Sequence, residues 1–110
     1  MPTATRTHTE ALSRLGHALS DVTRASVLLE LRHGAAYPSE LAGRLGVSRQ
    51  VMSNQLACLR GCGLVEAVPE GRRVSYRLTD AHLGPVLSDL LQLVLSVDPQ
   101  CCTGEGCACA

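Results

Sequence analysis

Apolar residues recur at helical spacing through the first half of the chain, alternate with polar residues over residues 64–78, and then return to helical spacing. The helical stretches are expected at residues 9–20, 21–34, 37–46 and 48–63, with a last helix starting near residue 80 and ending by residue 97. The alternating stretch turns at Glu70-Gly71, which predicts a β-hairpin. The pattern therefore predicts a mainly α fold with a hairpin, in the order ααααββα.

Residues typical of helix ends support these boundaries. Thr9, Asp21 and Ser48 each stand where a side-chain oxygen can cap the helix that follows, and Thr79 or Asp80 can cap the last one. Pro38 stands in the first turn of the third helix, a position that accepts proline. These signals are local and do not depend on how the helices pack.

The length and composition favour one domain that associates with a second copy. The chain has 110 residues, no Phe, no Trp and two Tyr, so its core is aliphatic and small. The last helix is apolar almost all round, and a second subunit would cover it. We expect a flexible N-terminus at 1–8, a domain at 9–97 that forms a homodimer through its terminal helices, and a cysteine-rich tail at 98–110.

The third and fourth helices have the form of a helix-turn-helix. The inner face of the fourth is apolar, and polar residues gather near its N-terminus, where a recognition helix contacts bases. The hairpin that follows has arginines near its turn, as a wing does. The candidate DNA contacts are Ser48, Arg49, Gln50, Ser53, Asn54 and Gln55 on the helix, and Arg72 and Arg73 on the wing.

The distribution of charge agrees with double-stranded DNA as a partner, although the formal net charge is zero. Between Arg44 and Arg77 there are six arginines and two acidic residues. We find no signal-peptide pattern or membrane-spanning run, so we expect a cytoplasmic protein without membrane contact. No catalytic arrangement or phosphate-binding glycine loop is present, which argues against an enzyme and against an organic cofactor.

The six cysteines are the remaining candidates for a functional site. Cys58 and Cys62 stand four residues apart on the fourth helix, so both sulfurs can reach one soft metal ion. They could instead be small buried residues that only fill the helix end. Four more cysteines lie in the tail, at Cys101, Cys102, Cys107 and Cys109.

The strings ALSDVTRASVLLEL, ELAGRLGVSRQVMSNQLACLRGCGLV and EGRRVSYRLTD resemble the ArsR/SmtB family of dimeric winged-helix repressors that respond to metals. Together they cover most of residues 11–97, and CLRGCGLV most resembles the CmtR branch of cadmium and lead sensors. Three features depart from the wider family. The third helix reads SELAGRL without a cysteine box, Asp80 and His82 form only half of a zinc site with Asp80 better explained as a cap, and Gln55 replaces the usual histidine.

The resemblance implies a metal site of Cys58 and Cys62, completed by Cys102 or Cys101 from the tail, whereas Cys107 and Cys109 have no secure counterpart. It implies an apo dimer on operator DNA that is released by Cd(II) or Pb(II). Arsenite, As(III), is the main rival, because the adjacent tail cysteines also resemble those of arsenite sensors, and Zn(II) is less favoured. The cysteines are also compatible with two different classes of protein, a thiol-based redox switch and a metal-buffering protein.

Overall fold

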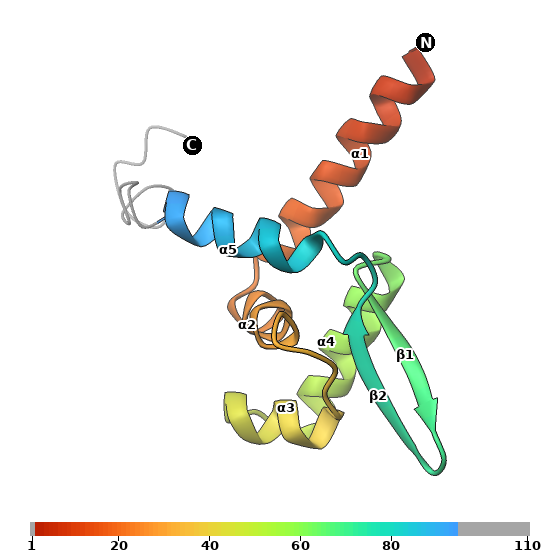
Figure 1. Ribbon diagram of the computed structural model, residues 1–110, viewed down its shortest axis with the longest axis vertical. Coiled ribbons are helices and arrows are strands. Elements are labelled where there is room, and N and C mark those ends of the chain that lie inside the picture. The colour runs from red at the N-terminus through yellow and green to blue at the C-terminus, as the bar shows by residue number, and fades with distance from the viewer. Residues whose placement is uncertain (1, 95–110) are drawn as a thin grey trace.

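The computed structural model describes the backbone of residues 2–94 and the side chains of residues 8–93 (Figure 1). Its elements follow the predicted order ααααββα. They are α1 (Pro2–Leu19), α2 (Val22–Leu31), α3 (Pro38–Leu45), α4 (Arg49–Gly61), β1 (Val65–Glu70), β2 (Arg73–Leu78) and α5 (Leu83–Val94). The expected extension of the last helix to residue 97 and the tail at 98–110 lie outside the described residues.

Most of the predicted helix ends are confirmed. Asp21 accepts a hydrogen bond from the backbone N–H of Arg24 at 3.0 Å, and Ser48 accepts one from Val51 at 3.1 Å. Pro38 is the first residue of α3. The cap predicted at Thr9 is wrong, because α1 begins at Pro2 and Thr9 lies inside it.

Helix α2 is the centre of the domain and contacts α1, α3, α4, β2 and α5. The buried face of α4, predicted from its spacing, packs into the same core. The largest fully buried side chains are Val27 and Leu28 of α2, Leu41 of α3, and Met52, Leu56 and Leu59 of α4. This aliphatic core fixes α4 against α2 and α3, so the opposite face of α4 is free to contact other molecules.

The hairpin pairs Val65 with Leu78 at its base and Glu70 with Arg73 at its end. The turn is therefore Gly71-Arg72, one residue later than predicted, and Gly71 has a φ of 65° that favours glycine. The hairpin is joined to the segment before α3 by paired backbone hydrogen bonds between Ala36 and Tyr76. This attachment holds the wing beside the helix-turn-helix.

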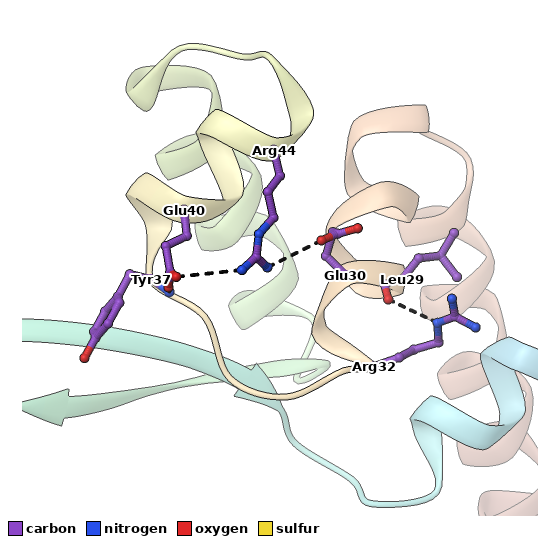
Figure 2. A network of polar contacts seen from close by, with 6 residues as sticks. All are labelled: Leu29, Glu30, Arg32, Tyr37, Glu40 and Arg44. Atoms are coloured by element: carbon purple, nitrogen blue, oxygen red, sulfur yellow. Dashed lines mark hydrogen bonds and ion pairs between the residues drawn. The ribbon is translucent and has the colours of Figure 1, made fainter.

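A surface network connects α2 and α3 (Figure 2). Arg44 lies between Glu30, at 3.5 Å, and Glu40, at 3.7 Å. The Glu40 carboxylate also accepts the backbone N–H of Tyr37 at 2.9 Å, which closes the first turn of α3. In Figure 2 the Tyr37 ring extends away from α3 toward the strands.

Helices α1 and α5 lie at the end of the molecule away from α3, and α1 projects from the rest of the domain (Figure 1). Large apolar side chains are exposed on this end, with Leu12 at 70% and Leu93 at 60% of their full accessibility. An apolar groove of about 320 Å³ opens between α1, α2 and α5, lined by Leu19, Ala25, Leu29, Leu87, Leu90 and Leu91. Among the described residues, no helix has the length and apolar character needed to cross a bilayer.

Candidate functional site

The N-terminal half of α4 presents a polar surface. Arg49, Gln50, Ser53 and Asn54 are all exposed, while Met52, one residue before Ser53, is buried. The Gln50 amide donates a hydrogen bond to the Asn54 side chain at 3.0 Å, so these two residues orient each other along the helix. The structure thus brings four predicted contact residues, with the capping Ser48 beside them, onto one accessible face.

Gln55 lies apart from this polar face. Its side chain is half-buried and accepts a hydrogen bond from Arg24 of α2 at 3.4 Å. The structure therefore places Gln55 against the domain itself, a position that does not favour its predicted contact with DNA.

Arg24 has a structural role that the sequence did not reveal. Besides Gln55, its guanidinium donates to the carbonyls of Ala18, at 3.2 Å, and His17, at 2.9 Å, in the last turn of α1. One side chain therefore links α1, α2 and α4. Arginine next to a helix start is common on surfaces, so its position in the sequence carried no signal of this role.

The two wing arginines occupy different environments. Arg72 is exposed in the turn, as predicted for a wing tip. Arg73 is the first residue of β2, and its guanidinium carbon lies 3.5 Å from the centroid of the Tyr37 ring. Arg73 is therefore held against the domain by a cation–π contact and is not free at the tip.

Tyr37 is itself fixed by the hairpin. Its hydroxyl donates to one oxygen of Glu70 at 2.8 Å, and the hydroxyl of buried Ser75 donates to the other oxygen. The two hydrogen bonds, and the one from Ser75 most of all, hold the pKa of Glu70 below its ordinary value. The hydrogen bond between Tyr37 and Glu70 also raises the pKa of Tyr37. Glu70 thus remains ionised and anchors the tyrosine.

Cys58 and Cys62 occupy the last turn and the C-cap of α4. Both are free thiols of intermediate exposure, and the Cys62 backbone N–H donates to the Cys58 carbonyl at 3.0 Å. With Gln55 they form a half-buried stripe at helical spacing toward the C-terminal end of α4. Because both cysteines are partly exposed on one side of the helix end, they are better suited to bind a soft metal ion than to fill a packed core.

The described residues hold no group of three or more His, Cys, Asp or Glu side chains able to bind a metal. Cys101, Cys102, Cys107 and Cys109 lie outside them. Cys58 and Cys62 alone could offer two thiolate ligands, so a site with three or more ligands would need others from outside the described residues.

A groove of about 410 Å³ opens beside Cys62, between α1 and the start of α5. Ala11 and Leu15 line one side, and Leu83 and Val86 the other. Asp80, at its rim, accepts the backbone N–H of His82 at 2.8 Å and contacts the His82 ring at 3.0 Å. The backbone hydrogen bond lowers the pKa of Asp80, in keeping with its predicted role at the helix start.

Comparisons with known proteins agree with this arrangement. The profile of "Bacterial regulatory protein, arsR family" matches residues 21–67. The HTH-type transcriptional regulator CmtR of Mycobacterium tuberculosis is 52% identical over 99 residues, which are 89% of this chain and 84% of CmtR.

Solved structures share the fold. The NMR structure of the cadmium metal-sensor CMTR from Mycobacterium tuberculosis matches with a TM-score of 0.67 over 84% of this chain and 98% of that one, at 52% identity. A homodimeric winged helix-turn-helix domain of Mb0332 from Mycobacterium bovis matches with a TM-score of 0.74 at 28% identity, over 83% of each chain. The chain therefore belongs to the arsR family of bacterial regulatory proteins and is a winged helix-turn-helix transcriptional regulator similar to CmtR.

Proposed function

We propose that this protein is a repressor that binds operator DNA as an apo homodimer and leaves it when Cd(II) or Pb(II) binds cysteine thiolates. The observation that carries the proposal is the position of two free, half-buried thiols on the same helix that presents the polar DNA face. The similarity to a cadmium sensor supports the choice of metal. As a regulator of operator DNA, the protein would act in the cytoplasm.

The dimer would form through α1 and α5. These helices expose Leu12, Val86 and Leu93, and water-exposed apolar surface of this kind is typical of a subunit interface. A relative with the same fold is homodimeric. Because α1 and α5 lie away from α3, next to which α4 begins, this contact would leave the polar N-terminal ends of both recognition helices free for a two-fold operator.

On DNA, Ser48, Arg49, Gln50, Ser53 and Asn54 would lie at or near the major groove. Arg72 and Arg73 would contact the backbone or the minor groove. Arginines that contact phosphates release counterions, so affinity should fall steeply as salt is added.

The metal site would consist of Cys58 and Cys62 with Cys102 or Cys101 from the tail. Thiolate sulfur is a soft ligand, so a site made of these cysteines would bind Cd(II), Pb(II) or As(III) more strongly than hard cations. Because thiols bind metals as thiolates, Cys58 and Cys62 would release protons on binding, and affinity would rise with pH.

Coupling between the two sites follows from their place on one rigid element. Gln50 and Cys58 are eight residues apart, about 12 Å along a helix. When a tail thiolate and Cys58 bind the same ion, the C-terminal end of α4 would be displaced, and the whole helix would shift relative to α2. The two recognition helices of the dimer would then no longer fit the two halves of the operator. A coupling of about 1–3 kcal/mol would weaken operator binding roughly 5- to 150-fold.

The test is an anaerobic titration of the reduced protein on its own promoter DNA with Cd(II), Pb(II), As(III) and Zn(II), following thiolate absorption and DNA release together. Cys58→Ser with Cys62→Ser should bind DNA normally but no longer respond to metal. Cys107→Ser with Cys109→Ser removes the same number of thiols and serves as the control, which should still be released. Normal release of the Cys58 and Cys62 variant would show that the sensing site lies elsewhere.

The same titration separates this function from its rivals. Release by As(III) without release by Cd(II) or Pb(II) would identify an arsenite sensor. A redox switch would stay on DNA under anaerobic metal and leave it with peroxide. A metal-buffering protein would show thiolate absorption without any change in DNA binding.

A further inference from the structure

Two arginines from distant parts of the chain line one groove of about 400 Å³ on the DNA-binding side of the domain. Arg49 begins α4 and Arg73 begins β2, and Tyr37 and Ser39 at the start of α3 complete the rim between them. The groove therefore lies where the helix-turn-helix meets the turn end of β2.

Within the described part of the chain, neither arginine forms an ion pair with a carboxylate. This contrasts with Arg77 of the same strand, which contacts Glu66 at 3.0 Å, and with Arg44, which lies between two glutamates. Glu70 pairs with Arg73 across the hairpin and attracts it electrostatically, but its two oxygens accept hydrogen bonds from Tyr37 and Ser75. The groove thus presents two guanidinium groups that no carboxylate contacts directly, with the Glu70 charge beside Arg73.

Arg73 is also preorganised. Its guanidinium lies over the Tyr37 ring, and the Tyr37 hydroxyl is held by Glu70, so the stack joins the loop before α3 to both ends of the hairpin turn. A stacked arginine loses less side-chain freedom on binding than one that extends freely into water. Its planar fork matches the oxygens of a phosphate group.

Resting on the proposed binding of operator DNA, we propose that this groove seats one backbone phosphate in each half-site, bound jointly by Arg49 and Arg73, with Tyr37 as the residue that positions Arg73. Arg49 is thereby assigned to the backbone and not to a base. Arg72, in the turn, acts independently of this seat.

The first arm of the test measures operator affinity against salt for the full-length reduced apo protein. Arg49→Ala and Arg73→Ala should each lower affinity about tenfold and reduce the salt slope by about one per protomer. Arg77→Ala is the matched control and should leave the slope unchanged. Tyr37→Leu should lower affinity about two- to fivefold, and should have no further effect when Arg73 is already alanine.

The second arm replaces single phosphates of the operator by neutral methylphosphonates. One position per half-site should abolish the effect of both Arg49→Ala and Arg73→Ala. The inference is overturned if the two arginines map to different phosphates, if Arg49→Ala relaxes preference for a particular base pair, or if Tyr37→Leu lowers affinity further in the Arg73→Ala background. Failure of the unaltered protein to bind its operator would instead overturn the proposed function.

Discussion

Arg24 offers the sharpest test of how the domain is held together. Its guanidinium donates two short hydrogen bonds to the end of α1, at 2.9 and 3.2 Å, and two of 3.4 Å to Ser20 and Gln55. A hydrogen bond from a charged group contributes about 1.5–3 kcal/mol to stability. Because the site is partly exposed, we take about half of this value for each of the two short bonds. We therefore expect Arg24→Ala to lower the free energy of unfolding by about 2 kcal/mol.

The measurement is urea unfolding of the reduced, metal-free protein, followed by circular dichroism at one fixed protomer concentration because association also contributes to stability. Gln55→Ala is the matched control, since it removes only one 3.4 Å contact and should cost less than about 1 kcal/mol. A change below about 0.5 kcal/mol for Arg24→Ala would refute this role, because ordinary surface substitutions fall in that range. Equal losses for the two variants would place the important contact at Gln55 instead.

Two further outcomes follow from the core and the wing. Leu56 is 1% exposed and lies between α4 and the rest of the core, so Leu56→Ala should cost about 2–5 kcal/mol in the same unfolding experiment; a loss below about 1 kcal/mol would mean that the site collapses around the smaller residue. Glu70 has a folded pKa below its ordinary value of 4.5, so its contribution to stability is present above that pH and is lost as the pH falls through the folded pKa. Glu70→Gln should therefore flatten the acid side of the stability profile, and an unchanged profile between pH 5 and 2, roughly the range over which such carboxyls titrate, would contradict the anchoring role.

The helices, their caps and the core face of α4 were predictable because each depends on residues a few positions apart. Asp21 and Ser48 bond within their own first turns, and Met52, Leu56 and Leu59 share a face by spacing alone. The closeness of Cys58 and Cys62 depends in the same way on residues four positions apart in one helix. The start of α1 was missed, since Thr9 looks like a cap but lies inside a longer helix.

Contacts between residues far apart in the sequence could not be predicted from the pattern of polar and apolar residues. No sequence pattern predicted that Arg24, 31 positions away, would lie against the Gln55 amide. Arg73 resembled the free tip of a wing until the fold brought the Tyr37 ring, from the segment before α3, against its guanidinium.

The sequence by itself determined the order of the elements, the polar end and the thiol end of α4, and the family to which the chain belongs, because period, capping and spacing are properties of neighbouring residues. Only the tertiary structure decided which of those side chains face outward and which are tied inward. Hydrogen bonds and cation–π contacts across 31 or more positions exist only after the aliphatic core has fixed α2, α4 and the hairpin against one another.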